Sequence, residues 1–181
     1  MFQKNVLNTY NIKKKLGVMQ GRMVPQESKK IQSFPWNNWR KEFKICKNYD
    51  FKILEWTVDS YKFDHNPINL KHYPKIINNL KKKYKIRIDS LTADFFMHRP
   101  FFKERSKNNF YKEAGKLFSI LNNSKKINIK YIVVPLVDNS SIKKMKNLNL
   151  FFKIMKSLEK TLKKNNQMIL FESDFNPKKL L

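Results

Sequence analysis

The sequence is poor in the residues that form covalent cross-links and phosphate loops: it has one cysteine, Cys46, and three glycines among 181 residues. A single cysteine excludes an internal disulfide framework and is typical of a reducing, cytoplasmic environment. Three glycines leave neither a GxGxxG motif nor a Walker loop, which excludes the Gly-rich nucleotide cradles. The longest apolar run, 131–137, is far shorter than the roughly 20 residues that span a bilayer. Residues 1–15 lack the apolar core of a secretory signal, so we expect a cytoplasmic chain without membrane contact.

Acidic residues are also scarce: 14 Asp and Glu face 39 Lys and Arg, for a net charge of +25. Only five of the basic residues are arginine, the side chain that grips guanine bidentately in base-reading proteins. The chain is also rich in Asn, Ile and Phe, whose codons are AT-rich, so nucleotide bias accounts for much of the lysine. We therefore predict a solvated, lysine-rich surface, and the alternative is a surface that binds nucleic acid. The electric field of such a positively charged surface would also attract small acidic or phosphorylated substrates.

Hydrophobic residues make up 41% of the chain and aromatic residues 14%, which is typical of a globular domain with a sizeable core. Apolar runs that read as strands alternate with segments of helical periodicity. Strands are expected to begin near residues 16, 51, 86, 130 and 167, and the apolar stripes of four helices fall within 36–46, 76–84, 110–121 and 142–162. This regular spacing predicts parallel βαβ units, for which a doubly wound sheet and a TIM barrel are both compatible.

Several local features complete the predicted order of elements. Cys46 lies on an apolar helical stripe with no histidine nearby in sequence, so we predict a core residue instead of a nucleophile. Pro135 cannot donate a ladder hydrogen bond and is expected near the end of its strand. Residues 138–141 are expected to cap the following helix, with Asp138 as a cap instead of a base. The aromatic segment 93–102 is predicted to be a loop.

The run 168–171 is predicted to be a buried strand, with Glu172 at its carboxyl end. In parallel α/β proteins the carboxyl ends of the strands meet at one crevice, where chemistry is usually placed. We therefore predict that Glu172 is a catalytic acid/base group and a metal ligand. The alternative is a structural salt bridge.

Other candidate site residues follow the earlier strands. Glu55 is predicted to line a substrate pocket, or else to form an ion pair in the core. Arg22 is predicted to bind a substrate phosphate or carboxylate, or else to be a surface cation. Asp94 and His98 are predicted to contact substrate or to lie in a lid, the alternative for His98 being a hydrogen-bonded loop histidine. The two other histidines, His65 and His72, are expected to be exposed to solvent.

Seven segments resemble those of one known family. They are LGVMQGRMVP, IQSFPW, WRKEF, FKILEWTVD, SLTADFFMHRPF, YIVVPLVDNSS and LFESD, and they occur in the expected order from residue 16 nearly to the end of the chain. Together they resemble the sugar phosphate isomerase/epimerase proteins of the xylose isomerase-like TIM-barrel superfamily. The combined order and the MQGR stretch carry most of this resemblance.

The resemblance implies an α/β fold, a partial (β/α)8 TIM barrel with about five parallel strands alternating with four helices in a single domain, 1–181. It also implies a divalent metal (Mg2+, Mn2+, Co2+ or Zn2+) at the carboxyl ends of the strands and a small sugar or sugar-phosphate substrate. Glu172 matches the fifth-strand glutamate, which binds the metal and exchanges the proton at the carbon next to the carbonyl. Such chemistry joins carbonyl polarisation to proton transfer through an enediolate.

The metal ligands and second carboxylate that the family carries on later strands have no counterpart in 1–181. We therefore expect the isolated chain to be incomplete or inactive as a metal-dependent isomerase or epimerase of carbohydrate metabolism. An open parallel edge after the fifth strand is expected to favour self-association.

Two other functions are compatible with this sequence. An apurinic-endonuclease-like DNA-repair enzyme of the same superfamily would use the positive charge, but it needs a histidine cluster for several zinc ions, and this chain has three scattered histidines. A non-catalytic, lysine-rich nucleic-acid-binding remnant would show affinity that depends steeply on salt and not on metal.

Overall fold

The computed structural model describes residues 16–27 and 33–176, and in them five strands form one sheet. The strands are β1 (Gly17–Met19), β2 (Ile53–Thr57), β3 (Ser90–Thr92), β4 (Tyr131–Leu136) and β5 (Met168–Ser173). Four long helices connect them: α2 (Trp39–Asn48), α3 (Tyr73–Tyr84), α5 (Lys107–Lys125) and α6 (Met145–Asn165). The predicted alternation of five strands with four helices is therefore confirmed.

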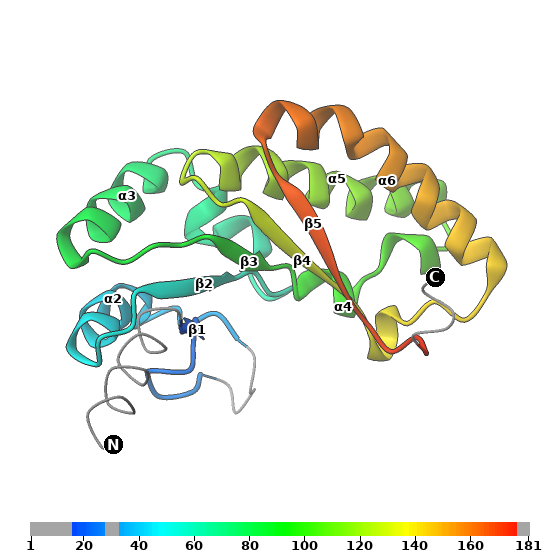
Figure 1. Cartoon of the computed structure of the whole chain (residues 1–181). Coiled ribbons are helices and arrows are strands. Elements are labelled where there is room, and N and C mark those ends of the chain that lie inside the picture. The colour runs from blue at the N-terminus through cyan, green and yellow to red at the C-terminus, as the bar shows by residue number, and fades with distance from the viewer. Residues whose placement is uncertain (1–15, 28–32, 177–181) are drawn as a thin grey trace, which may run out of the picture.

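All four strand pairs are parallel, and the spatial order β1-β2-β3-β4-β5 is the order in the sequence. A doubly wound sheet reverses its strand order at a switch point, whereas a barrel adds each strand beside the one before it. This order is the winding of a barrel and decides between the two predicted architectures. Figure 1 shows α3, α5 and α6 along one side of the sheet and β5 at its edge.

Side chains of the inner strands alternate between a face covered by helices and a more polar face. On β2, Leu54 and Trp56 are fully buried, whereas the alternate residues Ile53 and Glu55 are half-buried. The covered face packs against helix residues such as Phe43 and other members of one apolar cluster. Burial of a large aliphatic or aromatic side chain stabilises the fold by about 1.5–3 kcal/mol, so this face holds the sheet and helices together.

The aromatic segment 93–102, predicted to be a loop, contains the short helix α4 (Phe95–His98) and the 3-10 turn η3 (Phe101–Lys103). Four phenylalanines of this segment are at most 1% exposed, and the rings of Phe96 and Phe101 lie 5.4 Å apart. The prediction of a loop was wrong because elements of one turn are too short to show helical periodicity.

Two further expectations need correction around β3 and β4. Asp138 begins a separate 3-10 turn, η4 (Asp138–Ser140), and α6 starts only at Met145, with Lys144 in the cap position. The expected strand 86–92 pairs continuously only over Ser90–Thr92, and Arg87 forms an isolated bridge with Ile53. Both short elements depend on tertiary neighbours that local sequence does not reveal.

The strand β5 was predicted to be buried, and this was wrong. Met168, Leu170 and Phe171 are 56%, 41% and 49% exposed. Within the described residues β5 pairs only with β4, so it is an edge strand. An apolar run predicts a strand, but its burial depends on whether a neighbour covers it.

Within the described part of the chain, no helix combines the length and the apolar character that a membrane crossing requires.

Candidate active site at the carboxyl ends of the strands

Asp94 lies two residues after β3, and its side chain is 3% exposed. One of its carboxylate oxygens, Oδ2, is buried without a hydrogen-bond partner among the described residues. Burial is the largest cause that raises the pKa of Asp94 to about 7; the nearby carboxylates of Asp59, Glu172 and Glu55 contribute to this rise, and Arg22 opposes it. The carboxyl groups at or just beyond the carboxyl ends of β2, β3 and β5 therefore lie within electrostatic reach of one another. A carboxyl group with a pKa near neutrality can both accept and donate a proton at physiological pH.

Glu55 is held in place by two hydroxyl groups of β3. Ser90 Oγ donates to Glu55 Oε2 and Thr92 Oγ1 donates to Glu55 Oε1, each at 2.6 Å. Both contacts are on the sheet face opposite the buried Trp56 and Leu91, so Glu55 faces the inner side of the sheet. Its carboxylate has no ion-pair partner among the described residues, and it is therefore oriented without being neutralised.

Glu172 is the fifth residue of β5 and lies opposite Pro135 of β4 in the parallel register. The ring of the preceding residue, Phe171, lies 5.4 Å from that of Phe151 on α6, which marks the helix side of the strand. Alternation along a strand therefore directs Glu172 to the inner side, the side of Glu55. Glu172 is exposed there and raises the pKa of Asp94.

The loop after β1 carries Arg22, which is exposed and lowers the pKa of Asp94. Glu42 of α2 holds this loop: its Oε1 accepts hydrogen bonds from the amides of Gly21 (2.7 Å) and Met23 (3.5 Å), on both sides of Arg22. Glu42 is fully buried, and burial raises the pKa of its carboxyl group to about 7 despite these two bonds. The position of the guanidinium is thus coupled to a buried carboxyl group on another element.

Gln20 joins the loop after β1 to the end of β2. Its side-chain Oε1 accepts a hydrogen bond from the main-chain amide of Thr57 at 3.2 Å, and its main-chain amide donates to the carbonyl of Glu55 at 2.9 Å. Its Nε2 is buried with no hydrogen-bond partner within 16–27 and 33–176. A further carboxylate, Asp59, accepts a hydrogen bond of 2.8 Å from the amide of Phe34 and so fixes the next loop.

His98 does not join this group. It is exposed at the end of α4, does not contribute to the pKa shift of Asp94, and lines a separate hollow with Arg99 and Asn139. His65 and His72 are exposed, as predicted. The structure therefore brings together Glu172, Glu55, Asp94 and Arg22 from the predicted residues, and it places His98 apart.

A metal ion requires several donors at one point. Among the described residues, no three His, Cys, Asp or Glu side chains come close enough to hold a metal ion. The carboxylates around Asp94 thus share an electrostatic field without forming a ligand set, and this part of the chain does not fit a complete metal site. The described part likewise contains no histidine cluster of the kind that a multi-zinc endonuclease requires.

The sequence-based reasoning missed Glu42, Gln20 and Asp59 as site residues. Glu42 lies between Trp39 and Cys46 on the buried stripe of α2, and an acidic residue on an apolar stripe was a readable signal. Asp59 follows Glu55 and Thr57 at two-residue spacing, so the alternation of β2 could have indicated it. Cys46 is confirmed as a core residue, since it is fully buried and burial raises the pKa of its thiol to about 11.

Comparison with known proteins supports the fold. No protein-family model matches the sequence, and no curated protein matches it either. Among solved structures, the chain is similar to a xylose isomerase domain protein from Planctomyces limnophilus, with a TM-score of 0.56, 7% identity and coverage of 72% of this chain and 48% of that one. It is also similar to D-psicose 3-epimerase crystallised with D-fructose, with a TM-score of 0.59 and 12% identity. That match covers 84% of this chain and 50% of the epimerase chain.

A third similar structure is the IOLI protein with a bound zinc atom, with a TM-score of 0.51 and 18% identity. That match covers 74% of this chain and 46% of the IOLI chain. The chain spans about half the length of each of these structures. The chain therefore has a xylose isomerase-like TIM-barrel fold, of which it contains five strands in an open sheet. At these identities the likeness concerns the fold.

Proposed function

We propose that this chain is part of a metal-dependent isomerase or epimerase that acts on a sugar or sugar phosphate by proton transfer at the carbon next to the carbonyl. One observation carries the proposal: Asp94, buried and with a pKa of about 7, lies within the field of Glu172, Glu55 and Arg22 at the carboxyl ends of the strands. Fold neighbours that include an epimerase and a xylose isomerase domain protein agree with it.

In this proposal Glu172 removes the proton from the carbon next to the carbonyl and returns it. It is exposed on the inner side of the sheet, where a substrate can reach it. Asp94 exchanges a proton with a substrate oxygen, because a carboxyl group with a pKa near 7 is present in both protonation states at neutral pH.

The remaining residues bind and orient the substrate. Glu55 accepts hydrogen bonds from sugar hydroxyls, and Ser90 and Thr92 fix its carboxylate for this purpose. Arg22 attracts a phosphate or another anionic group of the substrate. His98, exposed at the end of α4 and apart from the acidic group, is proposed to contact the outer part of the substrate or a segment that covers it.

Glu172 is also proposed as one ligand of a divalent ion, Mg2+, Mn2+, Co2+ or Zn2+. One exposed carboxylate is not a metal site, and the described residues supply no set of three donors. The other ligands must therefore come from polypeptide outside these residues. The chain alone is expected to bind Mn2+ no more tightly than about 1 mM, the range of a weak site with few ligands. Tight binding of Mn2+ by residues 1–181, measured by calorimetry, would contradict this expectation.

The function is tested by incorporation of solvent deuterium into ketoses and ketose phosphates, beginning with D-fructose and followed by NMR in the presence of Mn2+. We expect incorporation by the whole polypeptide that contains this chain, little or none by residues 1–181 alone, and loss of incorporation in Glu172→Gln. Glu159→Gln, an exposed change on α6, is the matched control. Incorporation that survives Glu172→Gln unchanged would refute the assigned role.

A further inference from the structure

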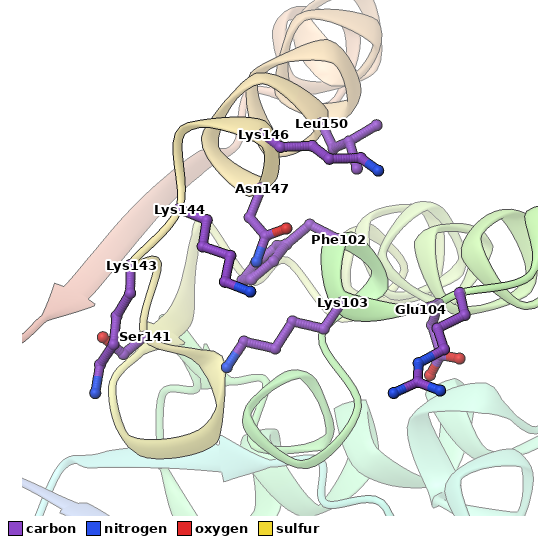
Figure 2. A pocket seen from close by; sticks show the side chains of 10 residues that line it. Phe102, Lys103, Glu104, Ser141, Lys143, Lys144, Lys146, Asn147 and Leu150 are labelled. Atoms are coloured by element: carbon purple, nitrogen blue, oxygen red, sulfur yellow. The ribbon is translucent and has the colours of Figure 1, made fainter.

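A hollow of about 680 Å3 lies outside the acidic site, between η3, the segment that follows η4, and the start of α6. Five cationic side chains line it, and they are Lys103, Arg105, Lys143, Lys144 and Lys146. Figure 2 shows Lys103 and Lys144 extending into the space between these elements, with Asn147 beside Lys144 and Ser141 near Lys143. Two adjoining hollows share lining residues with it, so the basic surface is continuous.

The described residues balance little of the positive charge of this hollow. Within the described residues, no carboxylate forms an ion pair with Lys143, Lys144, Lys146 or Arg105. The only carboxylate in the lining, Glu104, lies 4.0 Å from Arg99, a residue outside the lining. Like charges gathered around a concave space repel one another, and a bound anion relieves this repulsion.

The first turn of α6 adds to the attraction for an anion. The helix has 21 residues and no acidic residue in its first turn, and its cap residue Lys144 forms no side-chain cap. The partial positive charge at the amino end of a helix favours a phosphate placed there. The helix end and the lysines act on the same space, because Lys144, Lys146 and Asn147 belong to both.

We propose that this hollow binds a small phosphorylated molecule. Its volume lies within the range of small-molecule sites, about 300–1,000 Å3. Lysine ammonium groups bind phosphate as point charges. Proteins that bind single-stranded nucleic acid add exposed aromatic side chains on which bases stack. The only aromatic residue in the lining is Phe102, which is 1% exposed, so the hollow offers no such platform.

This site is independent of the proposed isomerase function, because it shares none of the residues around Asp94. It also changes the interpretation of the net charge. A lysine-rich surface predicts diffuse, weak attraction, whereas this arrangement concentrates around one concavity several lysines that have no ion-pair partner among the described residues.

The test measures binding of pyrophosphate to the full chain by calorimetry and by amide NMR shifts of residues 145–147. The variant replaces Lys143, Lys144 and Lys146 by alanine. The control replaces Lys153, Lys156 and Lys160 by alanine; these are exposed residues of the same helix outside the hollow, and the charge change is equal.

We expect the hollow variant to weaken binding by about tenfold or more and the control by less than about twofold. The largest amide shifts should fall at the start of α6. Equal weakening in both variants would overturn the proposal in favour of a diffuse field. Absence of pyrophosphate binding at millimolar concentration, or tight binding of a DNA oligonucleotide that pyrophosphate does not displace, would also overturn it.

Discussion

The carboxylate of Glu42 accepts a hydrogen bond of 2.7 Å from the main-chain amide of Gly21, the residue directly before Arg22. This bond ties a buried position of α2 to the loop that brings the guanidinium into the field of Asp94. A carboxyl group is an unusual choice for a fully buried site because its ionised form is costly to desolvate. The cost becomes measurable as a dependence of stability on pH.

Replacing Glu42 by Gln is expected to reduce the loss of stability at high pH. Burial raises the pKa of Glu42 from 4.5 to about 7, so the folded state binds the proton more tightly than the unfolded state. The neutral Glu42 carboxyl group therefore contributes to the free energy of unfolding below pH 4.5. This contribution, roughly 2–4 kcal/mol, is lost as the pH rises through about 7. Gln keeps an acceptor for the amide of Gly21 but cannot ionise. Chemical unfolding at pH 5 and pH 8 measures the difference, with Glu159→Gln as exposed control. Equal pH dependence in the wild type and Glu42→Gln would disprove this account.

Asp94→Asn is expected to stabilise the fold at pH 8 and to abolish catalysis by the whole protein. Burial first, and then the carboxylates of Asp59, Glu172 and Glu55, raise the pKa of Asp94 from 3.8 to about 7. Above that pH the ionised carboxylate of Asp94 destabilises the folded state by roughly 2–4 kcal/mol. The asparagine side chain of the variant cannot ionise and avoids this cost. Below pH 4 both side chains are neutral and the difference should vanish. Asp64→Asn, at an exposed position, is the control. Destabilisation by Asp94→Asn at pH 8 would mean that the charged carboxylate has a favourable partner.

The glycines Gly21 and Gly115 are expected to respond in opposite ways to alanine. Gly21 has a φ of +88°, and a Cβ there would lie 2.6 Å from the carbonyl oxygen of Ser33, so alanine should cost about 1–3 kcal/mol. Gly115 lies within α5, and a Cβ there would meet no atom within 4 Å, so alanine should stabilise by about 0.5–1 kcal/mol. Thermal unfolding of both variants checks the pair. A stabilising Gly21→Ala would show that the loop before Arg22 rearranges freely.

Leu170→Lys is expected to reduce self-association of the isolated chain. Leu170 is 41% exposed on β5, whose outer edge has no partner among the described strands, and such edges pair with other chains. A lysine at an exposed edge opposes this pairing. The control is Phe152→Lys, at an exposed apolar residue of α6. Sedimentation velocity should show fewer oligomers in Leu170→Lys than in the control. Equal oligomer content would locate the association elsewhere, and a fully monomeric wild type would refute the prediction.

The local sequence predicted the major elements well because each carries a strong periodic signal. The four long helices show apolar stripes, and the continuous β-branched run of β4 is typical of a strand buried on both faces. The short elements α4 and η4 were missed, and the start of α6 was placed too early, because one turn of helix depends on what packs against it. Among the site residues, Glu172 and Glu55 were readable from their positions near strand ends. The acidic Glu42 on an apolar stripe could have indicated burial, but local sequence could not predict its contact with a loop 19–21 residues away.

The sequence by itself determined the order of strands and helices, the single buried thiol and the excess of lysine, since these follow from periodicity, residue count and hydrophobicity. The tertiary structure decided three things. It chose barrel winding over a doubly wound sheet, because strand order in space is set by how the crossovers pack. It left β5 exposed, because burial requires a neighbour. It gathered Asp94 with Glu172, Glu55 and Arg22, and five cations around one hollow, because parallel strands and their loops bring residues far apart in the chain to the same edge of the sheet.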